Sequence, residues 1–151
     1  MRVALIGYGN VGRAFARLIE RKRAAFPFRI VGAHTARHGT AYDPNGLAVE
    51  PTFGPAAASV DEFLSVARPE VVVELTPLNP ESGEPAIAHI RAAFQRGIHV
   101  VTANKGPVAF AYAELAEGRP GAVAWSSATR RPRWTARLCT TWSATICRAS
   151  R

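Results

Sequence analysis

The sequence has little cysteine and no long apolar run, and both shortages narrow the class of protein. Its 151 residues include only two cysteines, Cys139 and Cys147, which are too few for a disulfide framework or a cysteine-based metal cluster. No segment of the sequence is apolar enough to span a bilayer. The apolar run at residues 3–6 is too short for a signal peptide. We therefore expect a cytoplasmic protein with one principal domain, because the chain is short for separate cofactor and substrate domains.

Acidic residues are absent from the last part of the chain. The formal net charge is +8, and such a charge spread over a whole fold would suggest nucleic-acid binding. Residues 1–117 hold 12 Lys and Arg and all 11 Asp and Glu, whereas residues 118–151 hold seven Arg, all three Trp and both Cys. This break predicts two segments of different origin or role, a domain over residues 1–117 and a basic tail over residues 118–151.

The start of the domain predicts a strand, a tight turn and an amphipathic helix. After the apolar run, glycines recur in a GxGxxG pattern, and apolar residues then follow at helical spacing. In this pattern Gly7 permits the turn, Gly9 lets a pyrophosphate approach the backbone, and Gly12 lets the helix pack closely on the strand. A glycine turn that only packs is the alternative, but the flanking strand and helix favour a dinucleotide site at the helix N-terminus. The motif residues are Gly7, Tyr8, Gly9, Asn10, Val11 and Gly12.

The second expected strand, at residues 28–34, ends without an acid. NAD-specific folds tend to place Asp or Glu here to hold the ribose 2′-hydroxyl. This chain has Arg37 and His38 instead, and no acid before Asp43. A cation at this point suits a 2′-phosphate, which favours NADP over NAD. Arg37 as a plain solvated loop residue is an equally good alternative.

The rest of the domain repeats the alternation of strand and helix. Turn residues fill positions 41–47, a capping box at residues 59–62 opens a helix, and Gly97 has the position of a left-handed cap at the end of another. A last helix is expected around residues 108–115. The pattern predicts an α/β fold with a doubly wound parallel sheet, of the Rossmann NAD(P)-binding type, followed by an irregular C-terminal tail. The expected strands are residues 3–6, 28–34, 71–75 and 98–103.

Three strand ends carry residues suited to ligand binding. The glycine turn, Thr76 and Lys105 each follow a strand at its carboxyl end, where open α/β sheets bind ligands, so we expect them to share one crevice. The ammonium of Lys105 would meet phosphate or substrate oxygens there, and a surface lysine in a turn is the alternative. His89 and His99 lack metal-ligand spacing, so we expect satisfied structural histidines and no metal.

Four segments together resemble the homoserine dehydrogenase family over about 115 residues. They are Gly7-Tyr8-Gly9-Asn10-Val11-Gly12, Tyr42-Asp43-Pro44-Asn45-Gly46-Leu47, Val73-Glu74-Leu75-Thr76-Pro77-Leu78 and Thr102-Ala103-Asn104-Lys105-Gly106-Pro107. The resemblance implies reduction of aspartate semialdehyde to homoserine with NAD(P)H, on the route to threonine and methionine. It also implies that the stretch from Tyr8 to Val11 and Thr76 contact the cofactor, and that Lys105 orients the reacting oxygen and shuttles its proton.

The family also has a substrate and dimerisation domain after this point, with a second lysine and an acid. We expect a truncated module that has neither and is weak or inactive alone, because the substrate would not be held against the nicotinamide.

The basic tail has three interpretations. Its Arg and Trp residues could bind RNA or single-stranded DNA, which would make the chain a non-catalytic nucleotide-binding or nucleic-acid-binding protein. The tail could instead be a disordered appendage. A third hypothesis is a frameshift between Glu117 and Arg131: read one base earlier, codons for the segment from Arg131 to Arg148 can encode a run that includes Ala-Val-Asp-Gly-Ala-Pro-Val-Tyr-Asn-Leu, which resembles the family's continuation. Sequencing the DNA tests this hypothesis.

Overall fold

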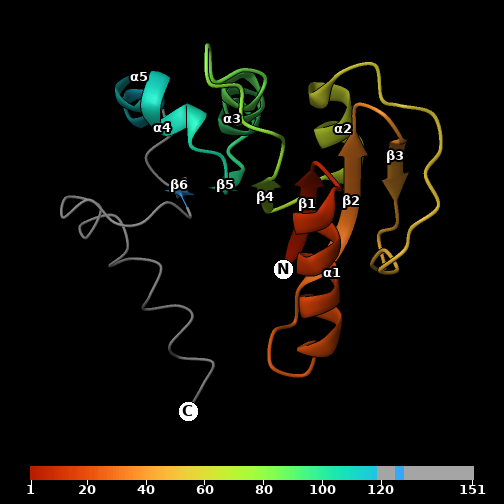
Figure 1. Cartoon of the computed structure of the whole chain (residues 1–151). Helices are drawn as coiled ribbons and strands as arrows, with labels where there is room; N and C mark the ends of the chain where they lie inside the picture. The colour runs from red at the N-terminus through yellow and green to blue at the C-terminus, as the bar shows by residue number, and fades with distance from the viewer. Residues whose placement is uncertain (119–124, 128–151) are drawn as a thin grey trace.

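A six-stranded sheet forms the centre of the protein, in the order β3-β2-β1-β4-β5-β6 (Figure 1). The computed structural model describes residues 1–118 and 125–127. All neighbouring strands are parallel except β2 and β3, which form an antiparallel hairpin. The predicted doubly wound α/β sheet is therefore confirmed, with one antiparallel edge strand added. The strands are β1 (Arg2–Ile6), β2 (Arg29–Thr35), β3 (Gly39–Tyr42), β4 (Val71–Glu74), β5 (His99–Thr102) and β6 (Trp125–Ser127).

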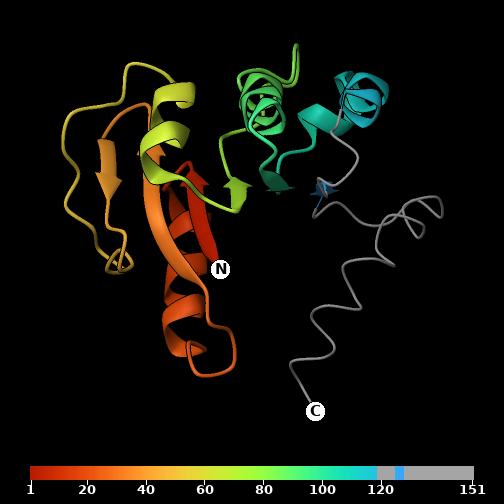
Figure 2. The same cartoon turned by 180° about the vertical axis from the view of Figure 1, so that it is seen from behind.

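Helices cover both faces of the sheet, as Figures 1 and 2 show from opposite sides. One face carries α1 and the other carries α2, α3 and α5. The described residues contain no helix that is long and apolar enough to cross a membrane. The helices are α1 (Asn10–Arg21), α2 (Val60–Ala67), α3 (Ala86–Gln95), α4 (Gly106–Phe110) and α5 (Tyr112–Glu117).

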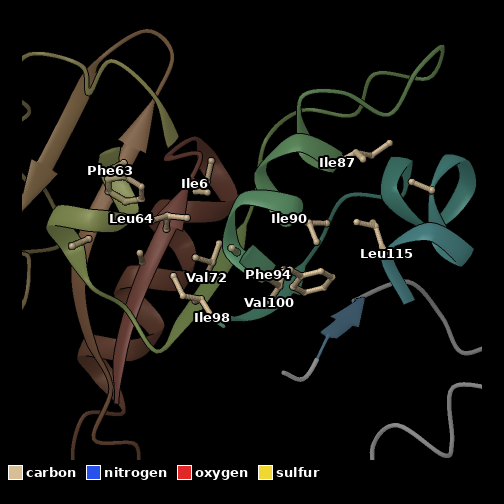
Figure 3. Packing of buried hydrophobic residues seen from close by; sticks show 14 residues of the cluster. Ile6, Phe63, Leu64, Val72, Ile87, Ile90, Phe94, Ile98, Val100 and Leu115 are labelled. Carbon is tan, nitrogen blue, oxygen red and sulfur yellow. The ribbon is translucent and has the colours of Figure 1, made fainter. Parts of the chain in front are cut away.

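The alternation of side chains along β1 divides the core into two clusters. Val3 and Leu5 pack with α1, whereas Ala4 and Ile6 pack with the helices of the opposite face. Successive side chains of a strand point to opposite faces, so a central strand of a doubly wound sheet must be apolar throughout. The larger cluster lies between α2, α3, α5 and the sheet (Figure 3).

Three elements differ from the sequence-based expectations. The turn predicted at residues 41–47 begins later, because Ala41 and Tyr42 belong to β3 and pair with Ala33 and Gly32. The expected last helix is divided into α4 and α5 at Ala111, whose φ is −137°. No proline or glycine marks that break in the sequence, so the helical spacing of the apolar residues continued across it.

The sheet also continues past residue 117, where the sequence analysis began the irregular tail. β6 pairs in parallel with β5, and its residues Trp125 and Ser127 lie opposite Val100 and Thr102. A three-residue strand is too short to show an alternating pattern, which is why the sequence did not reveal it. The rest of the predicted tail lies outside the described residues.

The Phe63 side chain on α2 packs against one face of the β2–β3 hairpin. It is fully buried, and its ring lies 5.3 Å from the ring of His34 and 5.7 Å from that of Tyr42. We expect Phe63→Ala to lower the free energy of unfolding by about 3–5 kcal/mol, because it removes a buried aromatic ring and leaves a cavity. Urea unfolding measures this change.

The matched control is Val66→Ala on the same helix, since the Val66 side chain is 57% exposed. It should change the free energy of unfolding by less than about 0.5 kcal/mol. Equal losses for the two variants would contradict this account of the core.

Candidate functional site

Loops that follow β1, β4 and β5 touch one another at the carboxyl edge of the sheet. Gly7 has a φ of +98°, and a Cβ placed on it would lie 2.8 Å from the carbonyl carbon and oxygen of Leu75. The Asn104 side-chain amide in turn donates to the carbonyls of Thr76 and Pro77, at 3.2 and 3.3 Å. The structure therefore brings the glycine turn, the Thr76 loop and the loop containing Lys105 together. We refer to this edge as the crevice, after the position at which open α/β sheets bind ligands.

The N-terminus of α1 lies at the crevice, and no capping side chain or nearby acid of the described residues occupies its first backbone amides. No side chain among the described residues caps this helix, and its first turn holds no acid. Gly9 is exposed, and a Cβ placed on it would meet nothing within 4 Å. Unpaired amides and the positive end of the helix dipole favour an anion at such a terminus. The residues present thus fit a pyrophosphate group.

Gly12 has the packing role that the motif predicts. A Cβ on Gly12 would lie 2.9 Å from the carbonyl oxygen of Gly7. Any larger residue would push α1 away from the turn. Asn10 and Val11, the motif positions between Gly9 and Gly12, are exposed at the start of the helix.

The Tyr8 side chain turns into the protein rather than toward the crevice. It is 5% exposed, its hydroxyl donates to the carbonyl of Val49 at 2.6 Å, and its ring meets that of Phe53 edge to face. Burial, with a smaller contribution from the charge of Glu50, raises the pKa of Tyr8 above its usual value. Only the backbone of Tyr8 is left for a ligand, and the ring fastens the segment around residues 49–53 to the glycine turn. Sequence reasoning gave no signal of this contact.

The end of β2 presents basic residues and no carboxylate. Arg37 and His38 are exposed in the turn between β2 and β3. The Thr35 hydroxyl beneath them is occupied, since it donates to the carbonyl of Gly39 and accepts from the amide of His38. Asp43, the next acid, lies toward the opposite end of β2, where its amide donates to the carbonyl of Val31 at 3.1 Å. No acid from this part of the described chain is therefore placed to hold a ribose 2′-hydroxyl.

Glu74 lies directly beneath the crevice, and the sequence analysis did not select it. Its carboxylate is fully buried at the end of β4. It accepts hydrogen bonds from the Thr76 amide at 2.8 Å, from the Thr76 hydroxyl, and from the Thr102 hydroxyl at 2.7 Å. An acid at the end of an otherwise apolar strand was the available signal, because charged residues are seldom buried without partners.

Lys105 is exposed in the loop between β5 and α4. The loop has little freedom, because the amide of Gly106 donates to the Asn104 side-chain oxygen at 2.9 Å. Gly106 also lies against Gly83, whose Cα would be 2.7 Å from a Cβ placed on Gly106. The Lys105 backbone is thus held on both sides while its ammonium reaches out.

His89 departs from the expectation of a satisfied histidine. Its Nδ1 is buried without a hydrogen-bond partner among the described residues. Burial, together with the nearby charge of His34, lowers the pKa of His89 to about 4. The helical position buries Nδ1 where no described residue pairs with it, which sequence spacing cannot show. The described residues contain no group of three or more His, Cys, Asp or Glu that could hold a metal.

Comparison with known proteins also indicates a dinucleotide-binding domain. Residues 7–120 match the family model described as homoserine dehydrogenase, NAD binding domain. The chain is 36% identical over 137 residues to a homoserine dehydrogenase from Methanocaldococcus jannaschii, covering 78% of this chain and 40% of that protein. It is 35% identical over 136 residues to an NAD(+)-dependent homoserine dehydrogenase from Pseudomonas canavaninivorans, covering 76% of this chain and 38% of that protein.

A solved structure supports the same assignment. A hyperthermophilic archaeal homoserine dehydrogenase mutant in complex with NADPH has 26% identity and a TM-score of 0.66, covering 83% of this chain and 42% of that one. The chain therefore spans about 40% of the length of the curated relatives that it matches. The fold and the resemblance inferred from the sequence are confirmed.

Gly7 and Gly9 should respond differently to the same substitution. Gly7→Ala places a Cβ 2.8 Å from backbone atoms at a positive φ, so we expect the free energy of unfolding to fall by at least about 2 kcal/mol. Gly9→Ala has a φ of −81° and open space, so it should keep the stability within about 1 kcal/mol. Thermal and urea unfolding of both variants check this, and comparable losses would show that the two turn positions are not distinguished as described.

The burial of His89 should make the protein sensitive to acid. Its pKa of about 4 in the folded state lies below the ordinary value of 6.5, so the unfolded state binds the extra proton between these values and stability falls as the pH drops from 6.5 toward 4. We expect His89→Leu to reduce that slope by up to about 1 kcal/mol per pH unit. Urea unfolding at several pH values measures it, and an unchanged slope would contradict the assignment.

Proposed function

The chain belongs to the homoserine dehydrogenase family, and on that premise we propose that it is the NADP(H)-binding part of an enzyme that interconverts aspartate semialdehyde and homoserine. The observation that carries the proposal is the crevice, in which the uncapped N-terminus of α1 and the loops after β4 and β5 meet. Such a crevice at the carboxyl edge of a doubly wound sheet is where dinucleotides bind.

In the proposed arrangement, the glycine turn and the Thr76 loop hold the cofactor. The backbone from Gly7 to Gly12 would take the pyrophosphate, with Tyr8 contributing only its main chain because its side chain is buried. Thr76 would border the nicotinamide end, since its loop touches the glycine turn. When bound, the nicotinamide supplies the hydride, and the protein supplies binding and orientation.

NADP is the cofactor that the end of β2 favours. Arg37 is exposed there, the Thr35 hydroxyl is occupied, and Asp43 lies toward the other end of the strand. One relative is described as NAD(+)-dependent, and a structural neighbour was solved in complex with NADPH. The relatives therefore do not determine the cofactor preference, and we infer it from the residues of this chain. A guanidinium matches a phosphate in charge and geometry.

Lys105 is the proposed catalytic residue. Its ammonium extends from a loop that Asn104 and Gly106 hold in place, which suits a group that must orient a reacting oxygen and move its proton. The substrate-binding site would be completed by the part of the enzyme that the family carries beyond the length matched here. The reaction would belong to threonine and methionine biosynthesis. The chain alone should therefore bind cofactor better than it turns over substrate.

The frameshift hypothesis stays a prediction, with the shift between Glu117 and Arg131. The pairing of β6 with β5 favours a position after Ser127 within that interval. The cytoplasmic location expected from the sequence also stays a prediction.

Binding of NADPH to the full chain tests the proposed function. Calorimetry or NADPH fluorescence should give saturable binding that Gly9→Ala weakens by roughly 10-fold, because a methyl group would stand where the pyrophosphate approaches. No binding of NADPH or NADH by the folded wild-type chain would refute the proposal.

Arg37→Ala tests the cofactor preference. We expect it to weaken NADPH binding roughly 10- to 100-fold, because a charged hydrogen bond to the 2′-phosphate is lost, and to leave NADH binding unchanged. Lys22→Ala, a cation at the far end of α1, serves as the control and should alter neither affinity. If Arg37→Ala weakens both cofactors equally or neither, the assigned role of Arg37 is wrong.

A further inference from the structure

We propose that Glu74 is a positioning residue that holds the Thr76 loop and the Lys105 loop together as one hydrogen-bonded unit. The inference rests on the proposed function, because it gives Glu74 a purpose in the cofactor crevice. It concerns a residue that neither the glycine motif nor the loop residues themselves include.

Glu74 is a buried carboxylate without a countercharge among the described residues. It is fully buried, and none of the ion pairs in the described part of the chain includes it. Burial of an ionised carboxylate is costly unless hydrogen bonds replace its lost hydration. Three donors do so here, two from Thr76 and one from Thr102. An apolar residue would fill the end of a buried strand at less cost, so the carboxylate answers a demand other than packing.

The Glu74 carboxylate accepts every hydrogen bond that it makes with Thr76 and Thr102. The Thr102 hydroxyl donates its only proton to Glu74, which leaves its oxygen free to accept the Asn104 amide at 3.0 Å. The Asn104 side chain then donates to the carbonyls of Thr76 and Pro77 and accepts from the amide of Gly106. The chain of bonds therefore begins at Glu74, passes through β5 and returns to the Thr76 loop.

Glu74 must accept at both oxygens for this arrangement to hold. One oxygen faces the amide and hydroxyl of Thr76, and the other faces the Thr102 hydroxyl. A glutamine would present an NH₂ group either to the Thr76 backbone amide, which cannot accept, or to the Thr102 hydroxyl, whose proton would then lose its acceptor. The Thr76 loop and the Lys105 loop would then lose their common anchor.

Four variants of the full chain test the proposal: Glu74→Gln, Thr102→Val, Thr102→Ser and the double variant Glu74→Gln/Thr102→Val. Thr102→Val keeps the shape of the side chain and removes its hydroxyl, whereas Thr102→Ser keeps the hydroxyl and serves as the matched control. The first readout is NADPH affinity under conditions where unfolding curves show each variant folded. The second is amide hydrogen exchange at Thr76, Asn104 and Gly106, compared with amides of α3.

We expect Glu74→Gln and Thr102→Val each to weaken NADPH binding about 10-fold and to speed exchange at the three loop amides about 10-fold, with α3 unchanged. Thr102→Ser should restore both properties to within about twofold of wild type, and the double variant should be no worse than either single variant, because all act on one unit. If Glu74→Gln does not fold, Thr102→Val carries the same test with Glu74 intact.

Folded variants that bind NADPH and exchange like wild type would overturn the proposal, and so would an equal rise in exchange over α3. The exchange readout does not need the cofactor. Absence of NADPH binding by wild type would therefore refute the proposed function, while the exchange data would still decide whether Glu74 holds the two loops.

Discussion

The close approach of two backbones, at Gly7 and Leu75, is the contact on which the crevice depends. Glycine is the residue type that fits at position 7, since any Cβ there would lie 2.8 Å from the Leu75 carbonyl. The φ of Gly7 is also one that other residues rarely adopt. The turn this permits sends the chain into α1 with its N-terminus facing the loops after β4 and β5. A side chain at Gly7 would push the start of α1 away from the residues around Thr76.

Much of the fold could be predicted because its signals are local. The glycine turn, the apolar strands and the capping box, in which Ser59 accepts the amide of Glu62, are all properties of short stretches of chain. Their order along the chain then determined the parallel sheet and the edge at which Thr76 and Lys105 lie.

The elements that could not be predicted depend on partners far away in the sequence. β3 exists because Thr40 and Ala41 pair with β2, although their own residues are typical of a turn. Tyr8 lies in the motif proposed to contact a pyrophosphate, yet its side-chain direction is set by a hydrogen bond to Val49, 41 residues later. The role of Glu74 depends on Thr102, 28 residues away. Side-chain periodicity contains no information on such pairs, which become visible only when strands are placed side by side.

The central position of β1 also has a consequence for the order in which the molecule can assemble. β1 pairs with β2, beginning only 27 residues further on, and with β4, which joins Val3 to Val71. Contacts of short sequence separation close at a lower entropic cost than distant ones. The segment from β1 to β3 can therefore form first, whereas the crevice forms only after β4 has paired with β1. A dinucleotide that requires the crevice would consequently bind only to chains that have completed this long-range pairing, so cofactor binding during refolding would report on the last strands to join the sheet rather than on the first.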